Sequence, residues 1–245
     1  MGLYVYAVGN ADDDEPPPLQ GVLDQPAYRL DAGPFCAVVS ECPMETVRAE
    51  RRHIAAAQRV LSALNREFDF LPMAFGTVTS SAADLRGFLE AHHEALTAQL
   101  KRVSGAVEMS LRLSLDVPDP IAYLVERTPA LVAARTRVFG SNRKATYDAK
   151  IRLGQMFDEA LRTYRETRAT QVVAGIGDFC AEVISLPVRK ETEIANLAAL
   201  VARSKRDEFD EAVHVSATQI DEDITFNVSG PWPPHNFVQF DPGNR

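Results

Sequence analysis

The most regular pattern in the chain is an alternation of apolar and polar residues over 107–117. Successive side chains of a strand point to opposite faces, so this period predicts a long strand with one buried and one wet face. A fold for this chain must therefore contain a sheet that is covered on at least one side. The apolar positions are Val107, Met109, Leu111, Leu113, Leu115 and Val117.

Two further strands and two helices are expected in the N-terminal half. Residues 2–8 and 35–39 are rich in apolar, β-branched and aromatic side chains, which favour strands. Apolar side chains recur at three- and four-residue steps across 43–68 and 85–103, which predicts two amphipathic helices. The hydroxyl residues of 79–81 can cap the second helix.

The expected order of this half is strand, strand, helix, strand, helix, strand, where 71–78 supplies the third strand. A ferredoxin-like unit has the order βαββαβ, so we interpret this half as a modified version of that unit. An acidic, proline-rich loop at 10–18 would replace its first helix. The two helices would then cover one face of an antiparallel sheet, an α+β arrangement.

The segment Val117–Pro120 contains two prolines and marks the expected boundary between a first domain, 1–118, and a second domain, 119–245. The second domain is also expected to be α+β, with a C-terminal tail rich in Pro and containing Trp. Its predicted helices are 121–126, 129–135, 145–168 and 190–206. Its predicted strands form two pairs, 171–176 with 180–186 and 213–216 with 224–228.

Two apolar stretches, Leu71–Val78 and Phe226–Phe237, are interrupted by Pro and Gly, so neither is typical of a plain helix or a central strand. The second contains Trp232, the one Trp of the chain. We expect the Trp232 segment to run back across the protein and pack mainly within it. For the first stretch two roles stay open. Its apolar side chains can fill the core of the first domain, or they can contact a partner through Leu71, Met73 and Phe75.

Composition limits the class of function. The 245 residues are 46% hydrophobic and 24% charged, which is typical of a globular protein. The formal net charge of −8 argues against a nucleic acid or an anionic membrane as the main partner. No window is apolar enough to span a bilayer, and the N-terminus has the pattern of a strand and not of a signal peptide. We therefore expect a cytoplasmic protein.

Motifs for catalysis are not found. The sequence His92-His93-Glu94 lacks the second His that a zinc-protease helix carries four residues after the first. Because His92 falls on the apolar face of its helix, we expect it in the core. There is no phosphate-binding loop, no nucleophile elbow and no set of cysteines with metal-ligand spacing. The residues thus predict a non-enzymatic protein with no cofactor and no metal.

One region is locally basic in this acidic chain. Asp148 is the one acidic residue between positions 135 and 152. Such a region can bind an anion, form a solvated face, or match the charge of an acidic partner. Its members are Arg135, Arg137, Arg143, Lys144, Lys150 and Arg152.

Taken together, the two interrupted stretches resemble the gas vesicle protein F/L family. The resemblance extends from about residue 3 to about residue 240, and the order and wide separation of its segments carry it. The matching segments are Leu3–Val8, Leu71–Thr77, Val107–Arg112 and Ser229–Val238. The residues that form its structural signature are Pro72, Gly76, Gly230, Pro231, Trp232, Pro233 and Pro234.

The resemblance implies a chaperone-like accessory protein of gas vesicle assembly, located in the cytoplasm and on the vesicle. It would bind the small hydrophobic shell protein, have other accessory proteins as further partners, and be a minor component of the vesicle. The alternative is a small-molecule-binding enzyme or sensor built on ferredoxin-like domains. In that case His92, Tyr147 or Arg112 would line a ligand pocket.

Overall fold

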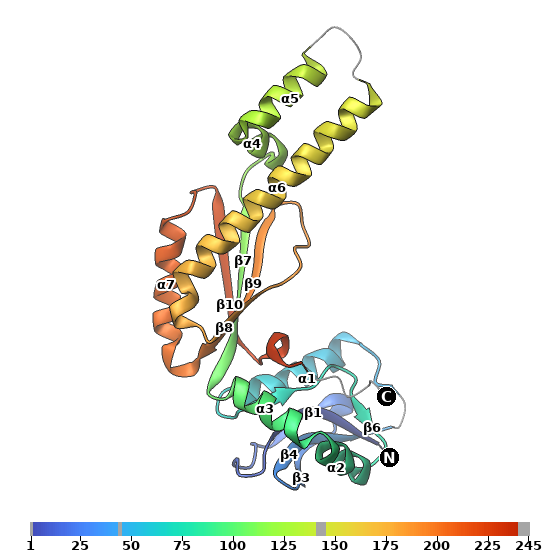
Figure 1. Cartoon of the computed structure of the whole chain (residues 1–245). Coiled ribbons are helices and arrows are strands. Elements are labelled where there is room, and N and C mark those ends of the chain that lie inside the picture. Colours follow the sequence, from blue (N-terminus) through green and yellow to red (C-terminus); the bar gives the residue numbers. More distant parts are fainter. Residues whose placement is uncertain (1, 44–45, 141–145, 240–245) are drawn as a thin grey trace. The chain divides into compact units, whose positions relative to one another are not determined.

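The computed structural model describes residues 2–43, 46–140 and 146–239 (Figure 1). The chain forms two compact units. Unit 1 takes in Met1–Met109, Leu200–Arg203 and Gly230–Arg245, and unit 2 takes in Ser110–Ala199 and Ser204–Ser229. The expected division into domains at residue 118 stays a prediction. Each unit is described by itself below.

Unit 1 contains an antiparallel sheet with the strand order β2-β3-β4-β1-β5, in which β6 also pairs with β1. The strands predicted at 2–8 and 35–39 are confirmed as β1 and β4. Strand β3 was not predicted, because its Pro, Arg and Asp residues conceal its apolar positions. The strands are β1 (Gly2–Asn10), β2 (Leu19–Gln20), β3 (Pro26–Ala32), β4 (Phe35–Cys42), β5 (Phe70–Pro72) and β6 (Val78–Thr79).

Helices cover both faces of this sheet and not one face as expected. Residues 2–9 of β1 are all buried, which is typical of a strand with both faces covered. On one face, Tyr4 and Tyr6 belong to a core cluster with apolar residues of α1 (Arg51–Leu64). On the other, Val5 lines a cavity together with residues of α2 (Ala82–Ala91).

The helix expected over 85–103 is divided into α2 and α3 (His93–Val103) at His92. Its cap is confirmed, since the side chain of Ser81 accepts a hydrogen bond from the Asp84 amide at 3.1 Å. The expectation that His92 is in the core is wrong. His92 is exposed, and its Nδ1 lies 2.8 Å from the carbonyl oxygen of Phe88 one turn earlier.

A second antiparallel sheet has the strand order β10-β7-β9-β8. The alternation that predicted the central strand is confirmed in β7, where Leu111, Leu113 and Leu115 are buried and Arg112 is exposed. These strands are β7 (Ala106–Leu115), β8 (Glu182–Ser185), β9 (Glu193–Ala202) and β10 (Ile224–Trp232). The remaining helices are α4 (Pro120–Arg127), α5 (Pro129–Phe139), α6 (Tyr147–Ile176) and α7 (Arg206–Thr218), and the short 3-10 turns are η1 (Val22–Asp24), η2 (Gly177–Phe179), η3 (Arg203–Lys205) and η4 (His235–Phe237).

Three expectations for this part of the chain are wrong. Residues 190–206 were expected to be a helix, but 193–202 form β9, whose residues 193–201 are all buried. The expected strand 171–176 is the end of α6, and the expected strand 213–216 lies in α7. A Cβ atom on Gly175 would lie 2.2 Å from Ser216 Oγ, so glycine permits α6 and α7 to approach closely. The α+β class with two antiparallel sheets is confirmed, while the ferredoxin-like detail stays a prediction.

Candidate functional site

The interrupted stretch at 70–79 runs along β1 as two short strands. Strand β5 pairs with residues 7–9 of β1, and β6 pairs with residues 3 and 4. Between β5 and β6, two hydrogen bonds still join the chain to β1. The Met73 amide donates to the Tyr6 carbonyl at 2.8 Å, and the Val5 amide donates to the Thr77 carbonyl at 2.9 Å. The irregular strand predicted here is therefore present, with residues 74–76 turned out of it.

The turn is fixed by a glycine and two aromatic rings. Gly76 has φ +88°, a conformation that strongly favours glycine. Its amide donates a hydrogen bond to the Tyr4 hydroxyl at 3.2 Å, and the ring of Phe75 stands edge-on to that of Tyr4 with 6.0 Å between centroids. Burial raises the pKa of Tyr4 to about 12, although the Gly76 hydrogen bond opposes the shift. Tyr4 therefore stays neutral and holds the turn.

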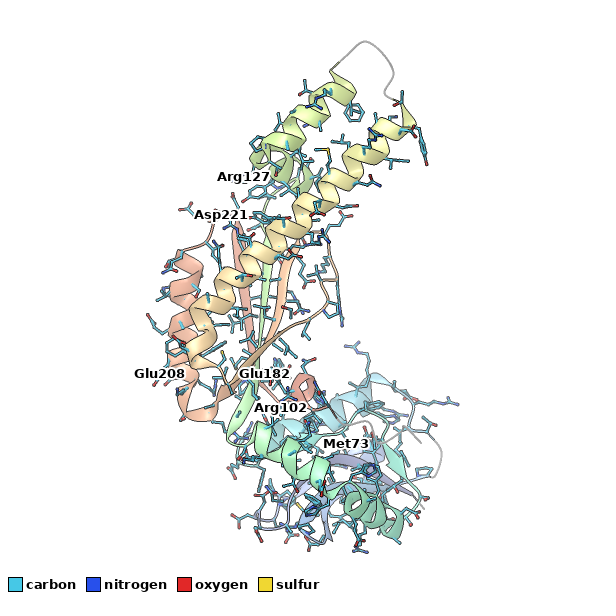
Figure 2. All side chains as sticks on the ribbon, viewed as in Figure 1. Met73, Arg102, Arg127, Glu182, Glu208 and Asp221 are labelled. Atoms are coloured by element: carbon cyan, nitrogen blue, oxygen red, sulfur yellow. The ribbon has the colours of Figure 1, made fainter. Side chains whose placement is uncertain are left out.

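A cavity of about 320 Å³ lies beside this turn. Its apolar lining comes from β1, from α2 and from Met73, which Figure 2 labels, while Thr77, Ser80 and Asp84 add polar groups. Of the three residues considered as partner contacts, Leu71 is fully buried and Met73 is 6% exposed. Phe75 is 37% exposed and is the one that presents a substantial area to solvent. Pro72 is buried at the end of β5.

The part of the second interrupted stretch that belongs to unit 1 comprises the end of β10 from Gly230 and the turn η4. Gly230 has φ +140°, and a Cβ atom there would lie 2.7 Å from Met109 Sδ, so this position requires glycine. The Trp232 segment was expected to pack mainly within the protein, and it does so only in part, because Trp232 is 43% exposed and Pro231 is also exposed. The residues that follow Trp232 are packed inside: Pro233 and Pro234 are buried, and Phe237 is fully buried.

Glu108 and Asn236 form a buried polar pair that the sequence pattern did not predict. Glu108 falls on the polar side of the β7 alternation, yet it is 5% exposed. Its carboxylate accepts hydrogen bonds from the Asn236 amide at 2.9 Å and from Asn236 Nδ2 at 2.6 Å. Burial raises the pKa of Glu108, and the two Asn236 hydrogen bonds oppose that shift. Arg102 on α3, which Figure 2 labels, donates from Nη1 to the Phe237 carbonyl at 2.8 Å.

In unit 2, α4, α5 and α6 enclose an apolar groove of about 480 Å³, which we call the hairpin groove. Figure 1 shows α5 and α6 side by side as a helical hairpin. The basic region of the sequence maps to this hairpin, with Arg135 and Lys150 lining the groove. Arg143 and Lys144 lie outside the described residues. The large apolar side chains that line the groove are Ile121, Val125, Leu131, Phe139, Leu153 and Phe157.

The residues considered for a ligand pocket have separate surroundings. His92 is exposed at the end of α2. Tyr147 is 79% exposed at the first position of α6. Arg112 Nε lies 2.7 Å from Glu193 Oε1 in an ion pair. Within the described ranges, no group of three or more His, Cys, Asp and Glu residues could hold a metal ion, and no helix is long and apolar enough to cross a membrane.

Relatives of known sequence match nearly the whole chain. Gas vesicle protein F of Streptomyces sp. (strain CB03234) is 26% identical over 244 residues, which cover 98% of this chain and 100% of that protein. Gas vesicle protein F1 of Halobacterium salinarum (strain ATCC 700922 / JCM 11081 / NRC-1) is 26% identical over 241 residues, which cover 96% of this chain and 92% of that protein.

Solved structures share the fold. The crystal structure of the gas vesicle protein GvpF from Anabaena sp. PCC7120 matches with a TM-score of 0.86 and 22% identity, over 98% of this chain and 99% of that one. GvpF from Microcystis aeruginosa matches with a TM-score of 0.83 and 21% identity, over the same shares. The sequence pattern of the family described as gas vesicle synthesis protein GvpL/GvpF matches residues 2–239. The chain therefore belongs to the GvpL/GvpF family of gas vesicle synthesis proteins.

Proposed function

We propose that this protein is an accessory protein of gas vesicle assembly that binds the small hydrophobic shell protein. It acts in a chaperone-like way in the cytoplasm and stays on the vesicle as a minor component. Other accessory proteins of the same assembly are further partners. The observation that carries this proposal is the match of residues 2–239 to a family of gas vesicle synthesis proteins.

The physical need for such a protein follows from the shell subunit. A subunit that packs into a water-excluding wall exposes apolar surface before assembly, and such surface aggregates. A protein with a formal net charge of −8 and a limited apolar contact surface can cover that surface and remain in solution. This function requires binding and release, so we infer that the protein works without catalysis and without a cofactor.

We place the shell contact at the turn of residues 74–76 and the adjoining cavity. Phe75 supplies the exposed aromatic area, and Met73 lines the cavity from inside. Large aromatic side chains and adaptable Met side chains both favour apolar recognition. Leu71 is fully buried beneath them, so its part in the contact is to support the turn.

Phe75→Asp tests the contact directly. Phe75 is 37% exposed, and Tyr28 on β3 of the same sheet is also 37% exposed, so Tyr28→Asp is a matched control. The shell protein is co-expressed with each variant, and its retention on the tagged accessory protein is measured beside the melting temperature. We expect Phe75→Asp to lose most of the captured shell protein and Tyr28→Asp to keep it.

Equal capture by both variants would remove the turn from the interface. Failure of the unmodified protein to capture the shell protein at all would contradict the proposed partner. Turnover or tight binding of a small metabolite at the cavity beside Met73 would instead favour the alternative of an enzyme or sensor.

A further inference from the structure

Among the residues that the structure describes, none covers the hairpin groove. Over the thirty residues of α6, the buried positions are Val172 and Ile176, both near its end. In α5 the buried position is Leu131. The half of the hairpin that lies away from the sheet therefore leaves apolar side chains at the surface, an arrangement that marks interaction sites. The exposed large apolar side chains of α4, α5 and α6 are Ile121 and Phe139, which line the groove, and Val132, Tyr147, Ile151 and Met156, which do not.

Charges along the groove are separated by sign. Lys150 and Arg135 line it toward the connection between α5 and α6, whereas Asp158 and Asp119 line it toward the start of α4. Lys150 and Asp158 are eight residues apart on one helix, which corresponds to about 12 Å at 1.5 Å per residue. The groove thus offers an apolar floor with a basic end and an acidic end.

Gly154 lies in the groove, and packing among the described residues does not explain it. It occupies the interior of α6, where glycine is less stable than alanine. A Cβ atom at Gly154 would meet no atom within 4 Å. Gly175 on the same helix is different, because α7 approaches it closely. A helix backbone that lies against the groove from outside would give Gly154 the role that α7 gives Gly175.

We propose that the hairpin groove binds an amphipathic α-helix of a partner protein, with acidic residues in its first turn and basic residues in its last. The apolar stripe of that helix covers the floor of the groove, as in other helix-in-groove complexes. Its acidic first turn lies beside Arg135 and Lys150, and its basic last turn lies beside Asp119 and Asp158. This distribution of charge also suits the macrodipole of the bound helix. The inference goes beyond the proposed function and holds for any partner that presents such a helix.

The test uses synthetic peptides and the full-length protein. One peptide has Leu at helical spacing, Glu in its first turn and Lys in its last turn. A second has the same composition with Glu and Lys exchanged, and a third replaces its Leu residues by Ser. Titration by fluorescence anisotropy should give a Kd about tenfold lower for the first peptide than for the second, and no measurable binding for the third.

Two variants connect this binding to the groove. Lys150→Glu combined with Asp158→Lys exchanges the charges at the two ends of the groove and should make the second peptide the preferred one.

Gly154→Ala should raise the melting temperature, because alanine favours the helix, and should weaken binding of the first peptide at least tenfold. Gly87→Ala is the matched control, since Gly87 lies inside α2 and a Cβ there also meets no atom within 4 Å. It should raise the melting temperature without a change in peptide affinity.

Equal affinity for the two charged peptides, or unchanged affinity in Gly154→Ala, would overturn the proposal. Sedimentation of the protein alone supplies a further outcome. A concentration-dependent dimer that Gly154→Ala abolishes would assign the groove to a second copy of this chain and would also overturn it. Because the peptides replace the partner, these results are independent of whether the shell protein binds at Phe75.

Discussion

Arg203 Nη1 donates a hydrogen bond to Asp69 Oδ1 at 2.6 Å, although the two residues are 134 positions apart in the chain. Asp69 also accepts from the Gly105 amide and from Ser104 Oγ, both at 2.8 Å. One carboxylate thus joins three segments of unit 1. Burial opposes ionisation of Asp69, but these hydrogen bonds outweigh it and lower its pKa.

The Asp69 network should make a measurable contribution at neutral pH. Asp69→Asn is expected to lower the free energy of unfolding at pH 7 by about 2 kcal/mol, the scale of hydrogen bonds to a charged group. Since the folded pKa lies below the unfolded value, this contribution is present above the unfolded pKa and is lost as the pH falls through the folded one. Urea unfolding from pH 7 to pH 3 should show the two proteins converge at the acidic end. Asp31→Asn, at a side chain 71% exposed, is the control and should change little.

Glu108 should show the opposite dependence on pH. Its folded pKa is raised, so ionisation favours the unfolded chain, and stability is lost as the pH rises from the unfolded pKa through the folded one. Glutamine keeps the shape: its Oε1 can accept from the backbone amide of Asn236, and its Nε2 can donate to Asn236 Oδ1 when that side-chain amide is rotated. Glu108→Gln is therefore expected to match or exceed the wild type in stability at pH 8, whereas Glu108→Ala should cost about 2 kcal/mol. Guanidinium unfolding at pH 5 and pH 8 measures both, and a large loss in Glu108→Gln would contradict the interpretation.

The two aromatic residues of the C-terminal segment should differ in their effect on stability. Phe237 is fully buried, and Phe237→Ala should cost about 3–5 kcal/mol. Trp232 is 43% exposed, so Trp232→Ala should cost less than half of that amount. Thermal unfolding of both variants gives the comparison. A larger loss in Trp232→Ala than in Phe237→Ala would contradict this comparison.

Gly230 and Gly154 provide a pair of glycine-to-alanine changes with opposite signs. Gly230→Ala combines a backbone at φ +140° with a contact of 2.7 Å to Met109 Sδ, and should cost about 2 kcal/mol or more. Gly154→Ala meets open space in a helix and should stabilise the protein by about 0.5–1 kcal/mol. Differential scanning calorimetry would reveal either sign, and a stable Gly230→Ala variant would exclude the close approach.

Sequence interpretation found strands that alternate or are rich in β-branched and aromatic residues, such as β7 and β1, and failed where neither signal is present. Strand β7 was predicted because its apolar residues alternate with exposed polar ones such as Arg112. Strand β9 was mistaken for a helix because residues 193–201 are all buried, so no alternation remains. Its Ala and Leu residues also favour a helix, and pairing with distant strands overrides that preference.

The candidate sites show the same limit. The signature stretches at 71–78 and 230–237 were located from their Pro and Gly residues, but which side chains in them are buried depends on contacts far along the chain. Trp232 was expected inside, yet Phe237 has that position. The basic region was recognised from its charges. Its association with an apolar groove required the pairing of α5 with α6, which no local pattern encodes.

The Glu108–Asn236 pair also has a consequence for biosynthesis. Residues 230–239 leave the ribosome after every other described part of unit 1. They supply Phe237 and Asn236, whereas the other described residues of that core have been synthesised before them. Until then the carboxylate of Glu108 and the pocket for Phe237 lack these partners. Unit 1 therefore completes its core only after synthesis of its final segment, so a nascent chain stalled before residue 230 should remain a substrate for cellular chaperones.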